Sequence, residues 1–206
     1  MQLRSDNFSN DQAIPPRFAF GKRGNPFALS DNFSPHLAWN GAPEGTRAFV
    51  LTCVDVDVPS RGDDVNQAGR TVPVNLPRVD FVHWMLANIP SECGELAAGA
   101  CSDEVTPRGK RAPVGPPGSV QGVNDFTGWF AGDADMAGTY LGYDGPCPPW
   151  NDERLHHYHF TLSALDAPLA LTAGFDLAQL REAMAGHVLA DASVIGTYSL
   201  NPAVMA

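Results

Sequence analysis

Three histidines and one tyrosine occupy residues 156–159, shortly after a loop rich in proline. The loop, "GPCPP", carries Pro146, Pro148 and Pro149, and proline fixes φ and lacks an N–H donor. This stretch therefore predicts a rigid loop rather than a helix or a central strand. Because imidazole rings change charge near neutral pH, the loop and the rings together could form the wall of a binding site.

The residues that follow the loop, "HHYHFTLSALD" at 156–166, predict a strand. Side chains alternate between the two faces of a strand, so His156 and Tyr158 share one face. His157 and His159 share the other face and are expected at the surface. A metal site is the weakest interpretation, because three histidines so arranged cannot all face one ion, although His157 and His159 could share an ion with a partner.

Two further predicted strands bring polar side chains to apolar faces. In "RAFVLTCVDVDV", residues 47–58, Asp55 and Asp57 end an apolar face, and the apolar character of both faces predicts a central strand. In "FVHWMLANIP", residues 81–90, His83 interrupts an apolar face. Strict alternation assigns Phe81, Met85 and Ala87 to the His83 face, and Val82, Trp84, Leu86 and Asn88 to the opposite face.

If these three strands are neighbours, their polar side chains form a pocket at one edge of the sheet. Two imidazoles, a phenol and two carboxylates suit an anion with a hydrogen-bonding head, such as a phosphate ester. Imidazolium, phenol O–H and loop N–H groups would donate, while the carboxylates would orient the rings and raise their pKa. The structural alternatives remain open: His83 could be a hydrogen-bonded core residue, and the aspartates could anchor the next loop.

The remaining pattern predicts a mainly β fold. The stretch "FDLAQLREAMAG" predicts a helix, with Asp176 as N-cap, Gln179 at the capping-box position and Gly186 at its end. "ASVIGTYS", residues 192–199, predicts a last strand, and the polar stretch 60–80 predicts a long loop. An antiparallel sheet sandwich with a little helix is the simplest architecture.

Composition narrows the function classes. The 206 residues, 44% of them apolar, predict a single domain over residues 1–206. A formal net charge of −10 opposes nucleic-acid binding, which needs a basic surface. No stretch is long and apolar enough to predict a membrane span, and the N-terminus lacks the apolar core of a secretory signal. We therefore expect a cytoplasmic protein.

The four cysteines are expected to be reduced thiols, because no C-x-x-C pair occurs and no export signal is present. A Cys93–Cys101 bridge is the least implausible exception. Cys147, inside the proline loop, is a candidate nucleophile for an alternative function, a hydrolase that uses aspartate and histidine as base and acid. A third hypothesis is a regulatory protein whose pocket docks a phosphorylated or acidic segment of a partner.

Five segments, spread in order over roughly residues 34 to 199, carry a resemblance to a known family. The chain resembles the phosphatidylethanolamine-binding protein family, also called Raf kinase inhibitor-like proteins, in its bacterial branch. The segments are "SPHLAWNGAPEGTRAFVL", "DVDVPS", "VHWMLANIP", "GYDGPCPPWNDERLHHYHFTLSALD" and "GHVLADASVIGTY".

The resemblance implies a set of ligand-binding residues. The family's pocket is built from a D-P-D-x-P segment, the histidine of an H-W strand, a G-P-x-P-P loop and an H-R-Y strand. The matching positions are Asp55, Asp57, Pro59, His83, Gly145, Pro146, Pro148, Pro149, His156 and Tyr158. Two positions depart from the pattern: Val56 replaces a proline, and His157 replaces an arginine. Because strand phase turns residue 157 away from the pocket, we expect His157 to change a surface contact and to leave the site intact.

The resemblance also implies a large central antiparallel sheet flanked by a smaller sheet and short helices. It implies non-catalytic binding of phosphorylated or anionic head groups without a cofactor or metal. Some members of the family inhibit kinases by direct association, and several bacterial members are homodimers. A kinase or other protein partner and a homodimer are therefore expectations for this chain, which the family name alone does not settle.

Overall fold

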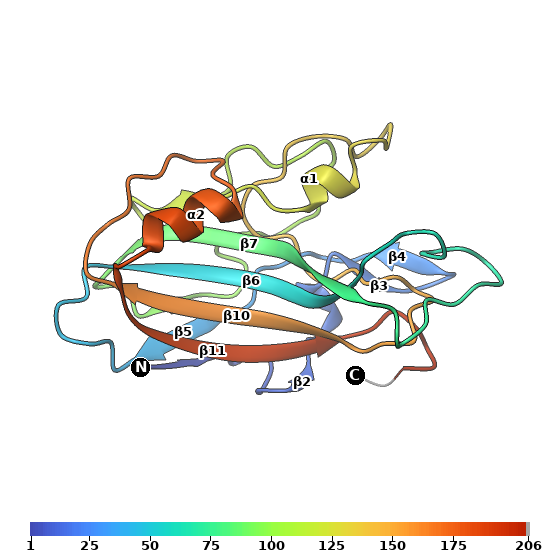
Figure 1. The fold of residues 1–206 in the computed structure, drawn as a ribbon, viewed down its shortest axis with the longest axis horizontal. Coiled ribbons are helices and arrows are strands. Elements are labelled where there is room, and N and C mark those ends of the chain that lie inside the picture. Colours follow the sequence, from blue (N-terminus) through green and yellow to red (C-terminus); the bar gives the residue numbers. More distant parts are fainter. Residues whose placement is uncertain (205–206) are drawn as a thin grey trace.

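Long apolar strands form the centre of the computed structural model, which describes residues 1–204 (Figure 1). The predicted central strand is β6 (Ala48–Pro59), which lies between β7 (Arg78–Pro90) and β10 (His156–Leu165). The six-stranded sheet is completed by β11 (Val188–Tyr198), β2 (Gln12–Ala13) and β9 (Val120–Gln121), in the order β2-β11-β10-β6-β7-β9. Every neighbouring pair is antiparallel except the short edge pair of β2 and β11. The prediction of a mainly β fold with a large, mostly antiparallel sheet is therefore confirmed.

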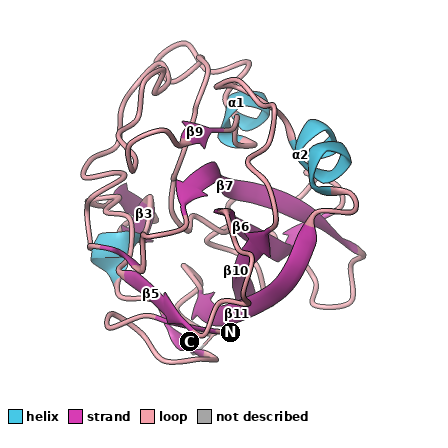
Figure 2. Ribbon diagram, turned by 90° about the vertical axis from the view of Figure 1, so that its left-hand side faces the viewer, coloured by secondary structure: helices cyan, strands magenta, loops and turns pink. Residues whose placement is uncertain are grey.

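Two smaller sheets and three short helices complete the fold. A three-stranded sheet contains β1 (Gln2–Arg4), β5 (Leu37–Asn40) and β8 (Glu95–Leu96), and β3 (Gly21–Arg23) pairs with β4 (Phe27–Leu29). The helices are η1 (Pro16–Phe18), α1 (Phe126–Trp129) and α2 (Leu177–Met184). Figure 2 shows α2 on one side of the large sheet and β3 and β5 on the other, with α1 beyond the β9 edge.

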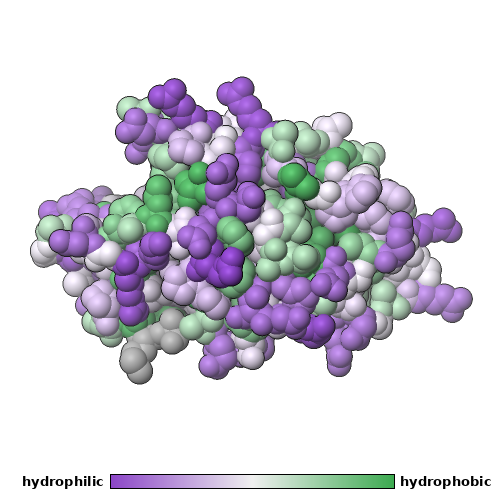
Figure 3. All heavy atoms as spheres, turned by 180° about the vertical axis from the view of Figure 1, so that it is seen from behind, coloured by the Kyte–Doolittle hydropathy of each residue, from purple (hydrophilic) through white to green (hydrophobic). Residues whose placement is uncertain are grey.

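Each face of the large sheet is covered by its own apolar cluster. Leu37 of the small sheet packs in one cluster with Leu51 and Phe160. On the opposite face, Leu180 of α2 packs in a second cluster with Val50. Burial on both faces explains why β6 is apolar at nearly every position before Asp55. Seen from behind, the outer surface mixes polar and apolar side chains (Figure 3).

Helix α2 begins as the sequence predicts. The Asp176 carboxylate accepts from the Gln179 backbone N–H at 2.8 Å, and the Gln179 side chain accepts from the Asp176 N–H at 2.9 Å. This capping box satisfies two donors that the first turn leaves free. Gly186 follows the helix with φ of 83°, a conformation that favours glycine.

Strict alternation along β7 is wrong after His83. Trp84 belongs to the cluster that contains Tyr158, whose ring lies 5.1 Å from the His83 ring, whereas Met85 belongs to the opposite cluster. His83 and Trp84 therefore share a face although they are consecutive. The pairing of β7 with β6 shifts register between Cys53 and Val54, and such a bulge changes the face on which following residues point.

Other sequence expectations concern the whole chain. All four cysteines lie within the described residues and are free thiols, so a Cys93–Cys101 bridge is absent there. None of the helices in residues 1–204 has the length and apolar character that a membrane crossing requires. A single domain over residues 1–206 stays a prediction, and its last two residues lie outside the described part of the chain.

Candidate ligand-binding site

Strand register brings three of the predicted polar side chains to one place. Tyr158 of β10 pairs with Asp55 of β6, and Asp55 pairs with Phe81 of β7, two residues from His83. A cavity of about 400 Å³ opens here, a size typical of small-molecule sites. Of the predicted site residues, those that line it are Asp55, Pro59, His83, Pro148, Pro149, His156 and Tyr158.

His156 is held between two carboxylates. Its Nδ1 lies 2.7 Å from Asp55 Oδ2, and its Nε2 lies 3.1 Å from Asp152 Oδ2. Burial alone would lower the pKa of His156, but the charge of Asp55 and the hydrogen bonds to both carboxylates raise it to about 9. His156 is therefore an imidazolium at neutral pH, and both of its N–H groups already have acceptors.

Asp152 continues this pairing away from the cavity. The Arg78 guanidinium donates to both of its oxygens, at 2.5 and 3.1 Å, and both side chains are nearly fully buried. Burial raises the pKa of Asp152, but the hydrogen bonds from His156 and Arg78 lower it below its ordinary value overall. Arg78, Asp152, His156 and Asp55 thus form a buried row of alternating charges. Two cations and two anions leave the row neutral, as buried charges require.

Asp55 is the end of this row that lines the cavity. One of its oxygens accepts from His156, and the other accepts from the Asp57 backbone N–H at 2.8 Å. Burial raises the pKa of Asp55, but His156 outweighs that effect and the pKa lies below its ordinary value. Asp55 is therefore ionised at neutral pH, and it presents negative charge to whatever occupies the cavity.

His83 has one ring nitrogen occupied and one available. Its Nδ1 lies 2.7 Å from the backbone carbonyl oxygen of Asp144, which can only accept, so Nδ1 carries the proton. Burial lowers the pKa of His83, and the nearby Asp55 charge offsets this only in part. The ring is therefore neutral at neutral pH, and its Nε2 is a hydrogen-bond acceptor.

A second buried network fixes Asp144 and, through it, His83. The Asp144 carboxylate accepts from the side-chain amides of Asn32 and Asn124, each at 2.8 Å, and lies 3.3 Å from Lys110 Nζ. Burial raises the pKa of Asp144, although Lys110 and the two amides act in the opposite direction. Three polar side chains thus hold Asp144, whose backbone carbonyl sets the His83 tautomer.

Tyr158 contributes an unpartnered hydrogen-bond donor to the floor. Its side chain is fully buried and lines the cavity, yet its hydroxyl has no hydrogen-bond partner among the described residues. Burial, followed by the charge of Asp55 and the nearness of its carboxylate to the hydroxyl, raises the pKa of Tyr158 well above its ordinary value, so the hydroxyl keeps its proton. The site therefore offers an unused donor beside the Nε2 acceptor of His83 and the Asp55 carboxylate.

Three predicted residues lie outside the cavity wall. Asp57 binds Arg154 at 2.6 Å and His157 at 2.8 Å, so it ties the start of β10 to the end of β6. The Gly145 N–H donates to Asn32 at 2.8 Å, and a Cβ at this glycine would lie 2.2 Å from a backbone oxygen. The Pro146 carbonyl accepts two backbone N–H groups, at 3.0 and 3.1 Å. These residues shape the loop that holds Pro148 and Pro149 in the wall.

The comparisons with known proteins concern the family and the fold of the whole chain. The family model described as phosphatidylethanolamine-binding protein matches residues 4–199. The chain belongs to the phosphatidylethanolamine-binding protein family. A UPF0098 protein of Methanothermobacter thermautotrophicus is 34% identical over 96% of this chain and 98% of its own length, and YbhB of Escherichia coli is 30% identical over 97% and 100%.

Solved structures of this family share the fold. YbcL of Escherichia coli, described as a new member of the mammalian family, superimposes with a TM-score of 0.69 at 26% identity, covering 96% of this chain and 97% of its own. The homologue CT736 of Chlamydia trachomatis gives a TM-score of 0.65 at 28% identity, covering 96% of each chain. Membership of this family supports a ligand-binding protein.

The departures from the family pattern leave the cavity floor assembled. His157, which stands in place of arginine, lies on the other face of β10 from Tyr158 and binds Asp57 outside the cavity wall. Val56, which stands in place of proline, is an exposed residue of β6 between the two aspartates. Asp55 keeps its contact with His156 in spite of this change.

The residues that sequence reasoning missed come mainly from loops. Asp152, Arg78 and Asp144 hold the two histidines, but they stand outside the regular strand patterns that predicted the other groups. Apolar side chains also supply most of the cavity wall. Those missed are Phe20, Phe27, Leu29, Val58, Val65, Phe81, Phe126, Trp129, Phe130 and Met136. The run "FTGWF" at 126–130 is the one local signal that could have indicated an aromatic wall.

The geometry does not support the hydrolase alternative. Burial raises the pKa of the Cys147 thiol to about 12, so it is not the thiolate that a nucleophile requires. Both nitrogens of His156 are occupied by carboxylates, so this ring has no free position to act as a base. Within residues 1–204, no group of three or more candidate side chains is placed to hold a metal ion.

Proposed function

We propose that this chain binds a small ligand through a phosphorylated or otherwise anionic head group at the cavity floor. The Tyr158 hydroxyl is the observation that carries the proposal. A buried donor without an acceptor costs about 1–3 kcal/mol, and an oxygen of a bound head group would remove that cost. Tyr158 lines the cavity together with Asp55 and His83, so a head group on the floor lies against all three side chains.

The charges of the floor limit which head group fits. Asp55 is ionised, and no lysine or arginine lines the cavity in the part of the chain that the structure describes. A fully ionised anion would therefore meet the Asp55 charge, and the only cation that the described residues place in the lining, the His156 imidazolium, is already paired with Asp55. A head group that keeps one proton fits better: its O–H donates to Asp55, and a second oxygen accepts from Tyr158. His83 takes up a proton as the anion binds and then donates from Nε2.

Calorimetric titration tests this function. The wild type should bind inorganic phosphate and phosphoethanolamine at pH 6, and Tyr158→Phe, which removes only the hydroxyl, should weaken both about tenfold. His159→Ala is the matched control, because His159 lies on the same strand but outside the cavity wall. Undetectable binding by the wild type, or equal affinity in the wild type and Tyr158→Phe, would contradict the proposal.

Regulation of a protein partner is a further part of the proposal. A phosphorylated segment of a kinase or another protein could place its phosphate on the same floor, and the association would then be competed by free phosphate. Pull-down with and without millimolar phosphate distinguishes this role from small-molecule binding alone. Homodimer formation and a cytoplasmic location stay predictions, which sedimentation and fractionation of cells can check.

A further inference from the structure

We propose that the ligand of this cavity is an aromatic acid, whose ring packs on a wall of aromatic side chains above the head-group site. This inference rests on the proposed function, because the same ligand places its head group on Tyr158, His83 and Asp55. The inference adds the chemical class of the part of the ligand that lies beyond its head group. The observations are the stacking of the wall, the exposure of its outer end, the size of the cavity and its charge.

Ring contacts connect His83 on the floor with Phe126 and Phe130 of the wall. The Phe126 ring lies 5.4 Å from the His83 ring and 5.3 Å from the Phe81 ring, nearly perpendicular to both. It also stacks on Phe20 at 4.6 Å and on Phe130 at 5.5 Å, with interplanar angles of 19° and 21°. These separations lie in the range of favourable aromatic pairs. A ligand ring of similar size would extend the same stacking.

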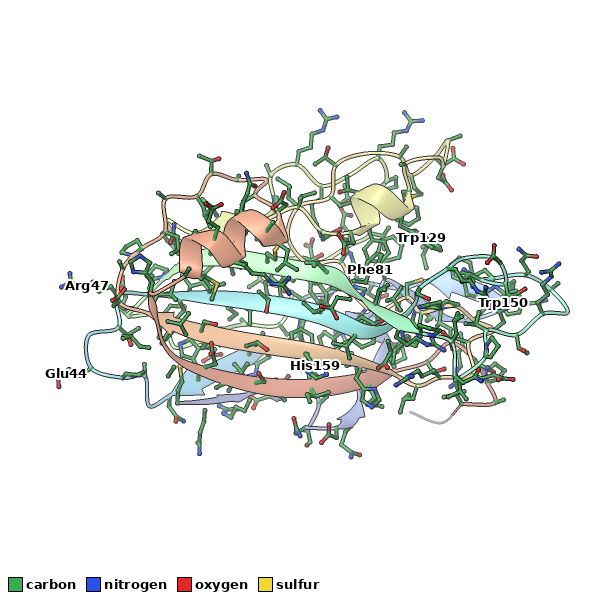
Figure 4. The ribbon with its side chains drawn as sticks, in the orientation of Figure 1. Glu44, Arg47, Phe81, Trp129, Trp150 and His159 are labelled. Atoms are coloured by element: carbon green, nitrogen blue, oxygen red, sulfur yellow. The ribbon has the colours of Figure 1, made fainter. Side chains whose placement is uncertain are left out.

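The outer end of the wall is exposed to solvent. Trp129 is 54% exposed, and Phe27 and Leu29 are 43% and 50% exposed, although all three line the cavity. Figure 4 places Phe81 and Trp129 close together beside β7 and α1, toward the end of the sheet opposite Glu44 and Arg47. Three large apolar side chains around one opening are not a scattered surface feature. They indicate that an apolar group covers them when the ligand is bound.

Hydrogen bonds fix the position of the aromatic wall. The short helix α1 begins at Phe126, and the Asp125 carboxylate before it accepts from the Val82 N–H at 2.6 Å. The Asn124 side chain accepts from the Phe126 N–H at 3.1 Å, and Asn124 also binds Asp144 behind His83. The aromatic wall and the His83 tautomer are therefore fixed by the same network. A ring and a head group joined by a short link would meet both surfaces at once.

Size and charge select the class of ligand. A cavity of about 400 Å³ is large for a phosphate or carboxylate alone, and most of the rest of its wall is apolar. Besides Asp55 and His156, the charged side chain that lines the cavity among the described residues is Asp133. Its carboxylate would repel a second negative charge on the ligand. An aromatic ring with one acidic group satisfies both conditions. A long acidic peptide would instead require basic side chains around the opening, and no lysine or arginine of the described residues lines the cavity.

Calorimetric titration at pH 6 with phenyl phosphate, inorganic phosphate, benzoate and acetate tests the inference. Phenyl phosphate should bind about tenfold to hundredfold more tightly than phosphate, and benzoate should exceed acetate by a similar factor, because the ring buries apolar area on the wall. The two pairs separate a phosphate head from a carboxylate head. Trp129→Ala and Leu29→Ala should reduce the phenyl phosphate to phosphate ratio at least threefold. Val114→Ala, another exposed apolar side chain but outside the cavity, should leave the ratio unchanged.

The outcomes distinguish this inference from the function on which it rests. Binding of phosphate or acetate that is no weaker than binding of the matched aromatic acid overturns the aromatic wall and leaves the head-group site standing. Equal losses for phenyl phosphate and phosphate in Trp129→Ala would also overturn it. Absence of binding for all four ligands overturns the proposed function and this inference together.

Discussion

Replacement of His156 by glutamine tests the buried row of charges most severely. The imidazolium joins Asp55 at 2.7 Å and Asp152 at 3.1 Å, with all three side chains buried. His156→Gln removes the positive charge and leaves the Asp55 carboxylate without a cation. Removal of one partner from a buried ion pair costs about 3–5 kcal/mol, so the free energy of unfolding at pH 7 should fall by that amount.

The same residue predicts how stability depends on pH. The pKa of His156 is about 9 in the folded chain and 6.5 in its ordinary state, so the folded state holds its proton more tightly. A raised pKa stabilises the fold fully below pH 6.5, and that contribution is lost as pH rises through about 9. A shift of this size corresponds to about 3 kcal/mol.

Urea unfolding between pH 6 and 10 measures both effects. Subtraction of the His156→Gln curve from the wild-type curve isolates the contribution of His156, which should decrease by about 3 kcal/mol across this window. His159→Gln, on the opposite face of the same strand, should change stability by less than about 0.5 kcal/mol. A constant difference between wild type and His156→Gln from pH 6 to 10 would refute the imidazolium and the row of charges.

Three further predictions follow from the same contacts. Arg78→Met removes the bidentate partner of Asp152 and should lower the free energy of unfolding in urea by about 3 kcal/mol, whereas no change would contradict a paired Asp152. Asp176→Ala removes the capping box of α2 and should cost about 1 kcal/mol, with Asp176→Asn as the conservative control. Phosphate binding at pH 7 should take up protons, to at most about one per ligand, as His83 becomes charged. Calorimetry in two buffers of different ionisation enthalpy measures this uptake, and its absence in wild type would contradict the role of His83.

Strand periodicity predicted the parts of the site that depend on local chain geometry. Alternation is regular at the site residues of β6 and β10, so it placed Asp55 on an apolar face of one strand and His156 with Tyr158 on one face of the other. The same rule failed after His83, because a register shift between neighbouring strands is not visible in the alternation of a single strand. The loop prolines indicated a rigid segment, but only Pro148 and Pro149 line the cavity.

The residues that support the two histidines could not be predicted from the sequence, for a physical reason. Asp144 and Asp152 act from loops, where no period relates a position in the chain to a direction in space. Their partners Lys110 and Arg78 lie 34 and 74 positions away along the chain. Long-range contacts of this kind follow from the complete fold and not from any one segment.

The protonation state of His83 during ligand binding tests the central claim most directly. Nitrogen NMR of the imidazole, recorded while phosphate is added at pH 7, follows Nδ1 and Nε2 separately. In the free protein Nδ1 should carry the proton and Nε2 should not, and phosphate should move the Nε2 signal to the protonated position in proportion to occupancy. An Nε2 signal that stays unchanged at saturating phosphate, or that is already protonated without ligand, would contradict the account.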